Sequence, residues 1–568
     1  MIKTLAKPRS FISEDLDITW EQIEPIFQNL LNREINDVQA LEKWLVDRSE
    51  LEAVLQEDYA WRYIRMTCDT SDEALGADFQ YFATEIEPKI APINNALDQK
   101  LVASPFIAEL QKEGYPIYFR KVKKALEIFR EENIPLFTEI QLKQQNYQTI
   151  VGALMVEIDG KEYTLQQAAA LLQEPDRDRR EQVWRKINAV RLTHKDALNE
   201  LFNELLSLRH QVALNAGFNN FRDYMFAAMG RFDYSVDDCL QFHDAVAENV
   251  VPVLQNFAQI RKDKLKVSTL RPWDMAVDPD NKAPLKPFAD GAELISKTEE
   301  AFGNLHPYMG KCIATMRENG LFDVESKKGK APGGYNYPLA ETGAPFIFMN
   351  AAGTLRDLTT MVHEGGHAIH TFISADLALT EFKSLPSEVA ELASMSMELI
   401  SMDQWHLFFP NPEDLKRAKQ EQLEDAISTL PWVATVDKFQ HWLYTNPGHT
   451  LAERNAAWLT IFREFGHGFA DWTSLEEAET YLWHKQLHIF EVPFYYIEYG
   501  FAQLGAIAVW KNYLQNKPLG LTNYLAALKL GYTQTIPEIY RVAGVNFDFS
   551  KRNIDALIGF LQQQLKEV

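Results

Sequence analysis

Apolar residues recur at every third or fourth position along most of this chain, and no other feature of the sequence limits its fold so strongly. The segments 242–265 and 292–320 show the pattern well, because each gathers its apolar side chains on one face of a helix. At 568 residues the chain is several times longer than a usual single-core domain. We therefore predict a large, mainly α protein with an N-terminal helical domain over residues 1–190 and a second helical domain over residues 191–568.

Two short stretches depart from the helical pattern and predict strands. Alternating residues over 153–165 flank Asp159-Gly160, a dipeptide that favours the two-residue turn of a β-hairpin. The aromatic and β-branched run at 345–350 follows a segment rich in glycine and proline. A strand there would lead directly into the stretch TTMVHEGGHAIH at 359–370, which is rich in histidine.

Charge and composition exclude several partners and compartments. The formal net charge of −23 argues against nucleic acid and anionic membrane surfaces, because both need a basic protein face. The first residues contain no continuous apolar core of a signal peptide, and no run approaches the roughly 20 apolar residues of a membrane span. The three cysteines lie far apart without C-x-x-C spacing, which suits a reducing compartment and excludes a thiolate zinc knuckle. We expect a cytoplasmic protein in which nitrogen and oxygen atoms hold any metal.

The histidine-rich stretch contains the pattern H-E-x-x-H. The apolar residues around it recur at helical spacing, which predicts a helix over about 356–374. On that helix His363 and His367 project from the same face, the arrangement in which two imidazoles can bind one metal ion. Glu364 lies about 100° further round the axis, where its carboxylate can accept a proton from a water molecule beside the metal.

This pattern alone does not decide between a metal site and a helix that is merely rich in histidine. Gly365 and Gly366 favour the metal site, because each costs about 1 kcal/mol relative to alanine inside a helix. We expect that the two glycines let a neighbouring element pack closely, with a tolerated accident as the alternative.

A catalytic zinc needs a third protein ligand, which should come from another element. His370 is too close to complete the site as in a metzincin, whose longer pattern has glycine at that position. The next predicted helix, 385–401, offers Glu388, Glu391 and Glu398. Spacing does not choose among them, and glutamates on helices are usually exposed. Glu391 and Glu398 nevertheless lie among small and apolar residues, where a carboxylate needs a partner.

Three segments together resemble the family of thimet oligopeptidase and oligoendopeptidase F, and most closely its oligoendopeptidase F or Pz-peptidase branch. They are FIFMNAAGTLRDLTTMVHEGGHAIH, LPSEVAELASMSMEL and WHKQLHIFEVPFYYIEYG, and the resemblance is strongest over about 330–505. It implies one zinc ion per chain, with Glu391, 24 residues after His367, as the third ligand. It also implies that Glu398 orients a zinc-bound histidine and that His370 is not a ligand.

By the same resemblance, the third segment supplies the groups that stabilise the oxyanion of the transition state. They are His488 and a tyrosine of the run Tyr495, Tyr496 and Tyr499, of which we choose Tyr496 and Tyr499. The distance from His488 to the tyrosines is one residue shorter than in the thimet branch. Without the resemblance, an aromatic core stripe would explain this segment equally well. His484, four residues before His488, is a packing or hydrogen-bonding residue in this interpretation.

The resemblance also implies a fold and an activity. The fold is a large two-lobed helical body with a deep central cleft, a zinc-dependent catalytic domain over 191–568, and a small β element before the zinc-binding helix. A substrate backbone would pair with the edge of the strand at 345–350, which gives affinity with little sequence preference. We therefore expect a zinc metalloendopeptidase that hydrolyses internal bonds of short peptides, with Glu364 as general base and then general acid.

Two other functions are compatible with the residues. Glu364 and His367 form an E-x-x-H, and Glu464 and His467 form a second, so a di-iron helix-bundle oxidoreductase is one alternative. It leaves His363 unexplained. A non-catalytic peptide-binding scaffold is the other alternative, and the intact ligand set argues against it. The sequence does not indicate an oligomeric state.

Overall fold

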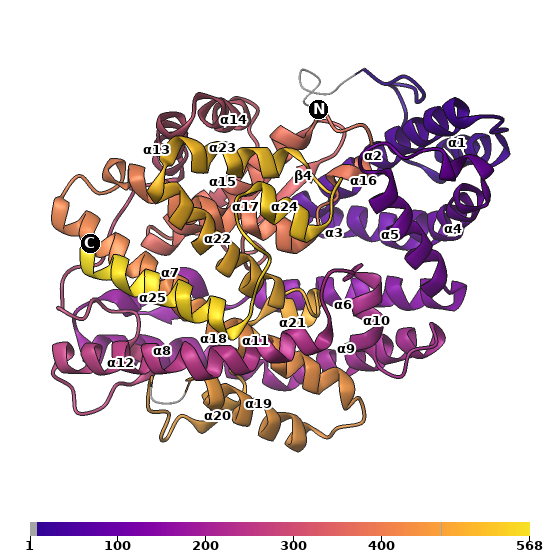
Figure 1. Ribbon diagram of the computed structural model, residues 1–568. Helices are drawn as coiled ribbons and strands as arrows, with labels where there is room; N and C mark the ends of the chain where they lie inside the picture. Colours follow the sequence, from indigo (N-terminus) through magenta and orange to yellow (C-terminus); the bar gives the residue numbers. More distant parts are fainter. Residues whose placement is uncertain (1–7, 467–468) are drawn as a thin grey trace.

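The computed structural model describes residues 8–466 and 469–568, and helices make up most of them (Figure 1). The N-terminal part contains α1 (Trp20–Asn32), α2 (Val38–Cys68), α3 (Glu73–Tyr81), α4 (Glu87–Ala103), α5 (Tyr115–Ile128) and α6 (Ile134–Gly152). Next come α7 (Leu165–Ala170), α8 (Arg177–Thr193), α9 (Lys195–Asn215), α10 (Phe221–Ala228), α11 (Val236–Asn249) and α12 (Val251–Leu265). Further along lie α13 (Gly291–Leu305), α14 (Pro307–Glu318), α15 (Leu355–Ser374), α16 (Thr380–Lys383), α17 (Ser387–Ile400) and α18 (Pro412–Thr445). The last helices are α19 (Leu451–Gly466), α20 (Glu476–Thr480), α21 (Leu487–Glu491), α22 (Ile497–Gln515), α23 (Lys517–Lys529), α24 (Ile536–Val542) and α25 (Lys551–Glu567).

These helices form two broad layers. In the orientation of Figure 1, α13, α14, α15 and α23 lie in the upper part, and α8, α9, α11, α12 and α19 lie in the lower part. Helices α1, α2, α4 and α5 gather at the upper right, where a hydrophobic cluster of their own joins them to residues near α16. The prediction of a mainly α protein is confirmed.

The predicted hairpin is present. Strands β1 (Met155–Ile158) and β2 (Lys161–Thr164) pair antiparallel, with Ile158 opposite Lys161 at the turn. Asp159 and Gly160 both have positive φ, at 55° and 76°. This is the backbone conformation that makes Asp-Gly favourable in a two-residue hairpin turn.

The predicted strand before the histidine-rich helix is also present, but its place in the sheet is not the expected one. Strand β5 (Ala344–Ala351) pairs in parallel with β3 (Phe322–Glu325) and antiparallel with β4 (Tyr335–Leu339), in the order β3-β5-β4. The prediction that the strand at 345–350 offers its edge to a substrate was wrong, because β5 is central and hydrogen-bonds on both sides. In the described part of the chain, the unpaired edges lie on β3 and β4, and the start of β4 is the one that adjoins Glu364.

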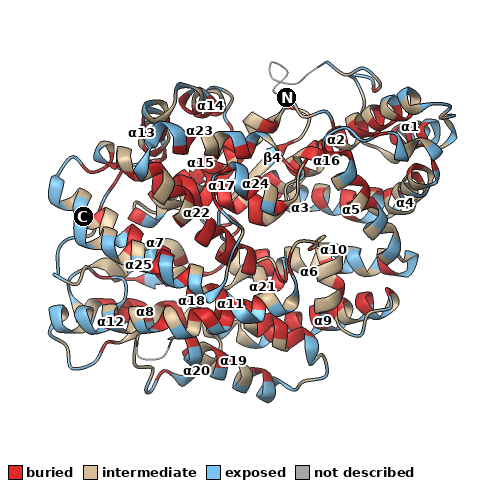
Figure 2. Ribbon diagram, in the orientation of Figure 1, coloured by how far each residue is buried: buried red, intermediate tan, exposed pale blue. Residues whose placement is uncertain are grey.

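The large hydrophobic core surrounds α17, which packs against both α15 and α22. Figure 2 shows buried residues concentrated along these three helices. The sequence explains the burial of α22, because its segment GFAQLGAIAVW carries apolar and small residues around the whole circumference of the helix. The histidine-bearing helix α15 is therefore held inside the molecule and not on its surface.

Two other predictions concern the chain as a whole. In the part that the structure describes, no helix combines the length and the apolar character that crossing a bilayer requires. The division at residue 190 lies within α8 and stays a prediction.

Candidate metal centre

Helix α15 begins with a reciprocal cap and presents both histidines of the motif to α17. The Thr354 side chain accepts a hydrogen bond from the Asp357 backbone N–H, and the Asp357 carboxylate accepts one from the Thr354 backbone N–H, which satisfies two free donors at the helix start. The apolar face of the helix is buried in the core. His363 and His367 remain partly accessible, with 17% of each side chain exposed.

The two glycines of the motif allow the close packing that we predicted. A Cβ at Gly366 would lie 2.6 Å from the Cα of Ser394 and 2.8 Å from the carbonyl oxygen of Ala393, both on the backbone of α17. A Cβ at Gly365 would lie 2.6 Å from the ring of Phe302 on α13. Since side chains at these positions would collide with their neighbours, the expectation of close packing is confirmed. It is the missing Cβ at Gly366 that lets α17 approach α15.

This close approach brings one glutamate of α17 between the two imidazoles. Glu391 Oε2 lies 3.2 Å from His363 Nε2 and 3.5 Å from His367 Nε2. Burial alone would raise the pKa of Glu391, but the adjacent His367 and His363 hold it well below its usual value. Two nitrogen donors and one carboxylate oxygen, all within 4.8 Å of one another, form a donor set that suits zinc.

The other two glutamates that spacing left open face other groups. Glu398 Oε1 accepts a hydrogen bond from His363 Nδ1 at 2.7 Å, and Gln422 Nε2 donates to Glu398 Oε2 at 3.0 Å. This contact leaves His363 Nε2 directed toward Glu391. The Glu388 carboxyl instead lies near Arg231, away from the two histidines. The role of Gln422, on α18, has no signal in the sequence because it depends on how α17 and α18 pack.

Glu364 lies beside the donor set and not in it. Its side chain is buried, with 5% of the residue exposed, and burial raises the pKa of its carboxyl group. A Cβ at Gly334 would lie 3.7 Å from Glu364 Oε1, and Asn336 Nδ2 donates to the backbone oxygen of Glu364. The carboxylate therefore faces the start of β4.

The segment after α20 places His488 and three tyrosines against the same site. Tyr495 Oη donates to Glu391 Oε1 at 2.6 Å, and His488 Nε2 lies 3.3 Å from Tyr499 Oη. The rings of His488 and Tyr496 are in edge contact, with centroids 4.9 Å apart. We chose Tyr496 and Tyr499 from the sequence; the direct contact of Tyr495 with Glu391 was not expected.

Neighbouring side chains determine which nitrogen of His488 carries the proton. Trp432 Nε1, which can only donate, binds Gln486 Oε1 at 3.0 Å and so orients the Gln486 amide. Gln486 Nε2 then donates to His488 Nδ1 at 2.7 Å. Burial lowers the pKa of His488 to about 4, so the neutral ring carries its single proton on Nε2. The sequence does not signal this chain of contacts.

The two remaining histidines near the motifs do not join the donor set. His370 is fully buried, and burial lowers its pKa to about 3. His484 Nε2 pairs with Asn199 Oδ1 at 3.2 Å, and its ring packs against Trp483. Both positions agree with the structural roles that we expected.

The pattern behind the di-iron alternative is not assembled around α15 in the described residues. Glu464 on α19 binds Lys438 Nζ at 2.7 Å and 2.9 Å, and it does not join the donor set of His363, His367 and Glu391. His467, the second member of that E-x-x-H, lies outside the described residues.

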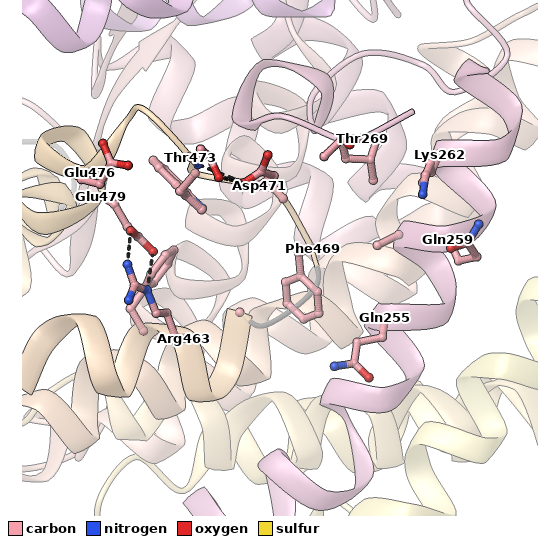
Figure 3. Close-up of a pocket in the computed structure, with 16 residues that line it drawn as sticks. Gln255, Gln259, Lys262, Thr269, Arg463, Phe469, Asp471, Thr473, Glu476 and Glu479 are labelled. Atoms are coloured by element: carbon pink, nitrogen blue, oxygen red, sulfur yellow. Dashed lines mark hydrogen bonds and ion pairs between the residues drawn. The ribbon is translucent and has the colours of Figure 1, made fainter. Parts of the chain in front are cut away.

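A cavity of about 510 Å³ lies elsewhere, between α12 and residues 462–466 and 469–479 (Figure 3). Its carboxylates are already paired: Glu479 binds Arg463 at 2.7 Å, and Asp471 accepts a hydrogen bond from Thr473 Oγ1 at 2.6 Å. Among the described residues, neither histidine nor cysteine lines it. The described lining therefore offers no imidazole or thiolate, and Glu479 and Asp471 are already bound to other groups.

Comparisons with known proteins agree over most of the chain. The model of Peptidase family M3 matches residues 170–557, and that of the Peptidase M3 N-terminal domain matches residues 16–129. An oligoendopeptidase F homolog of Borreliella burgdorferi is 22% identical over 85% of this chain and 81% of its own length. The chromosomal oligoendopeptidase F of Lactococcus lactis subsp. cremoris is 24% identical over 57% of this chain and 54% of its own length. A solved structure of Pz peptidase A with an inhibitor has a TM-score of 0.92 at 28% identity, covering 98% of this chain and 99% of that one.

Proposed function

The chain belongs to peptidase family M3, and on that premise we propose that it is a zinc metalloendopeptidase that hydrolyses internal peptide bonds of short oligopeptides. The observation that carries the proposal is the position of Glu391 Oε2, 3.2 Å and 3.5 Å from the Nε2 atoms of His363 and His367. A buried carboxylate between two imidazoles is the donor set that a catalytic zinc requires.

In this proposal His363, His367 and Glu391 hold the zinc ion. Bound there, zinc would polarise the carbonyl of the scissile bond and lower the pKa of a water molecule toward 7. Glu398 accepts the Nδ1 proton of His363 and so keeps Nε2 free to bind the metal. Tyr495 donates to Glu391 Oε1, which leaves Oε2 as the oxygen that faces the imidazoles.

The proton transfers fall to Glu364. Its carboxylate takes a proton from the attacking water and returns it to the leaving amine. Burial raises the pKa of Glu364 and so brings it closer to neutral pH. A pKa near the working pH makes it easier for the group both to accept and to return a proton. Glu364 is not in the donor set, and it lies next to Gly334, close to where a peptide would lie.

His488, with Tyr496 or Tyr499, stabilises the oxyanion. The neutral His488 ring carries its proton on Nε2, the nitrogen that lies 3.3 Å from Tyr499 Oη. A donor that is already oriented before the reaction stabilises developing charge without reorganisation. Gln486 and Trp432 act as positioning residues, because they decide which ring nitrogen is protonated.

The free edge of β4 is the surface on which an extended peptide would bind. Backbone pairing along Tyr335–Leu339 would carry the substrate past Gly334 and hence past Glu364. Recognition of this kind uses main-chain hydrogen bonds, so it places little demand on the substrate sequence. Such pairing favours flexible chains over folded proteins, because a folded protein cannot present an extended strand. The burial of the site, where only 17% of each histidine side chain is exposed, limits access further and favours short chains over long ones.

The proposed substrate class can be tested with quenched fluorescent peptides of increasing length, a series that ends in unfolded casein. We expect fast cleavage of the short peptides at internal bonds, slow cleavage of casein, and no cleavage of either after zinc is removed with a chelator. Mass spectrometry of the products identifies the bonds. Casein cleavage as fast as peptide cleavage would contradict the size limit, and activity after complete zinc removal would contradict the proposed chemistry.

Gln486→Glu should make activity depend on pH in a way that the unaltered protein does not. The new carboxylate would face His488 Nδ1 and raise the pKa of His488 from about 4. Below the raised pKa both ring nitrogens carry protons and Nε2 still donates; above it the single proton stays on Nδ1. We expect kcat/KM to fall by about 10²- to 10³-fold as the pH rises through that pKa, the usual effect of losing one oxyanion donor.

The matched control for this variant is Gln486→Met, which removes the amide without adding a charge. It should lower kcat/KM moderately and leave the pH profile unchanged in shape, since no new group titrates. Profiles of kcat/KM against pH for the three proteins make the comparison. Parallel profiles for Gln486→Glu and the unaltered protein would show that Gln486 does not control the protonation of His488.

A further inference from the structure

A second group of metal-ligand side chains lies outside the proposed catalytic centre, where α11 packs against α18. Cys239 and His243 are four residues apart on α11, and Asp437 and His441 are four residues apart on α18. Side chains with this spacing project from the same face of a helix, so each helix contributes two of them to the contact. All four are buried, with exposed fractions of 0%, 1%, 0% and 5% in that order.

The donor atoms of this group converge. One ligand atom each of Cys239, Asp437 and His441 lies within 4.8 Å of the other two. His441 Nε2 is 3.2 Å from Asp437 Oδ2, and His243 Nε2 is 2.8 Å from the same oxygen. Metal–sulfur and metal–nitrogen distances of about 2.3 Å and 2.0 Å place the ligands of a tetrahedral zinc with one sulfur about 3.3–3.5 Å apart. Small side-chain rotations are therefore enough to close these three residues around one ion.

Several polar atoms at this point have no hydrogen-bond partner in the described structure. They are His243 Nδ1, Asp437 Oδ1, and both ring nitrogens of His441, whose 3.2 Å contact with Asp437 does not have hydrogen-bond geometry. Apolar rings surround the group: the His441 ring packs edge-on against Phe494, with centroids 5.4 Å apart, and Phe242 adjoins His243. Buried polar atoms in such surroundings need a partner.

We propose that Cys239, Asp437 and His441 bind a second divalent metal ion of the zinc type, with His243 orienting Asp437. A thiolate, a carboxylate and an imidazole match the ligand preferences of zinc, and a cysteine is typical of structural zinc sites. Binding releases the thiol proton to solvent. One divalent cation, one thiolate and one carboxylate then form a neutral unit, which suits an apolar environment.

The second ion would link α11 to α18 next to residues 494–499, the segment that contains the three tyrosines of the proposed catalytic centre. Phe494, against which His441 packs, precedes Tyr495 in the chain and has a positive φ of 69°. Its backbone N–H donates to Gln440, the neighbour of His441, and its backbone oxygen accepts from Arg231. Holding α18 in place therefore holds the backbone from which Tyr495 reaches Glu391. The site itself does not depend on the proposed peptidase activity.

The proposed site departs from an expectation drawn from the sequence. The distant cysteines without C-x-x-C spacing led us to expect that nitrogen and oxygen alone would hold a metal. The fold brings Cys239 within reach of two residues about two hundred positions away in the chain, a proximity that spacing along the chain does not reveal.

Cobalt distinguishes the two sites, because only the second contains a sulfur ligand. We expect the full-length protein as purified to contain two zinc ions per chain, and the protein produced with cobalt in the growth medium to show a thiolate-to-cobalt charge-transfer band in the near ultraviolet. His367→Ala, which disrupts the proposed catalytic set, should keep the band and one ion per chain. Cys239→Ser should lose the band and also keep one ion per chain.

Two further variants separate metal binding from folding. Cys312→Ser alters another buried cysteine on α14 and should keep both the band and two ions. Asp437→Asn, which is nearly isosteric, should also lose the band. It provides the same test if Cys239→Ser does not fold. One zinc ion per chain in the unaltered protein together with no charge-transfer band would overturn the proposal, as would a band that survives in both Cys239→Ser and Asp437→Asn. Neither result would affect the proposed peptidase function, which the peptide series tests separately.

Discussion

Glu364→Gln should lower kcat/KM for a fluorescent peptide by about 10²- to 10⁴-fold, the range associated with removing a general acid–base group. The amide has nearly the same size and shape as the carboxylate but cannot accept and return a proton. Glu364 is not in the donor set of His363, His367 and Glu391, so zinc content should stay at the level of the unaltered protein. The circular dichroism spectrum and the melting temperature should change little.

The matched control is Glu464→Gln, which makes the same chemical change in the other E-x-x-H of the chain. Glu464, on α19, forms an ion pair with Lys438 on α18 and belongs to no proposed site. Hydrolysis should therefore be unaffected. A Glu364→Gln protein that cleaves peptide at the normal rate would refute its assignment as the base. A large loss in Glu464→Gln instead would revive the alternative in which both E-x-x-H patterns act together.

Features of the site that depend on a single helix could be predicted from the sequence. His363 and His367 share a face of α15 because residues four apart always do, and Glu364 must then lie beside them. The unfavourable placement of Gly365 and Gly366 in a helix interior indicated close packing, and the structure confirms it. Helical spacing alone was sufficient for these features because it determines the geometry within one helix.

Features that depend on distant segments could not be predicted in the same way. The run at 345–350 predicts a strand, but nothing in it specifies that β3 and β4 occupy both of its edges. Spacing likewise left three glutamates of α17 open, and a resemblance was needed to single out Glu391. The control of His488 by its near neighbour Gln486 also requires Trp432, which lies on the distant helix α18. Such contacts depend on tertiary packing, for which one sequence without its relatives contains little information.

Gly366→Ala should destabilise the protein and weaken zinc binding together. The new Cβ would meet the backbone of α17 at 2.6 Å and 2.8 Å, and a backbone cannot rotate away as a side chain can. Overpacking of a core usually costs about 1–3 kcal/mol, and we expect the upper part of this range because α17 must move as a unit. Its movement would carry Glu391 away from His363 and His367. Thermal unfolding and zinc titration would measure both effects.

Gly559→Ala and Gly365→Ala are the two comparison variants for this prediction. Gly559 lies in α25, where an added Cβ meets nothing within 4 Å, so alanine there should stabilise the helix by about 0.5–1 kcal/mol. At Gly365 the added Cβ meets the Phe302 ring, which can shift, so the effect should lie between the other two. If Gly366→Ala matched Gly559→Ala in stability and zinc affinity, the close approach of α17 would not be what positions Glu391. We expect the largest loss of stability at Gly366, where the added Cβ meets backbone, which moves least. The loss should be smaller at Gly365, where it meets a ring, and absent at Gly559, where it meets nothing.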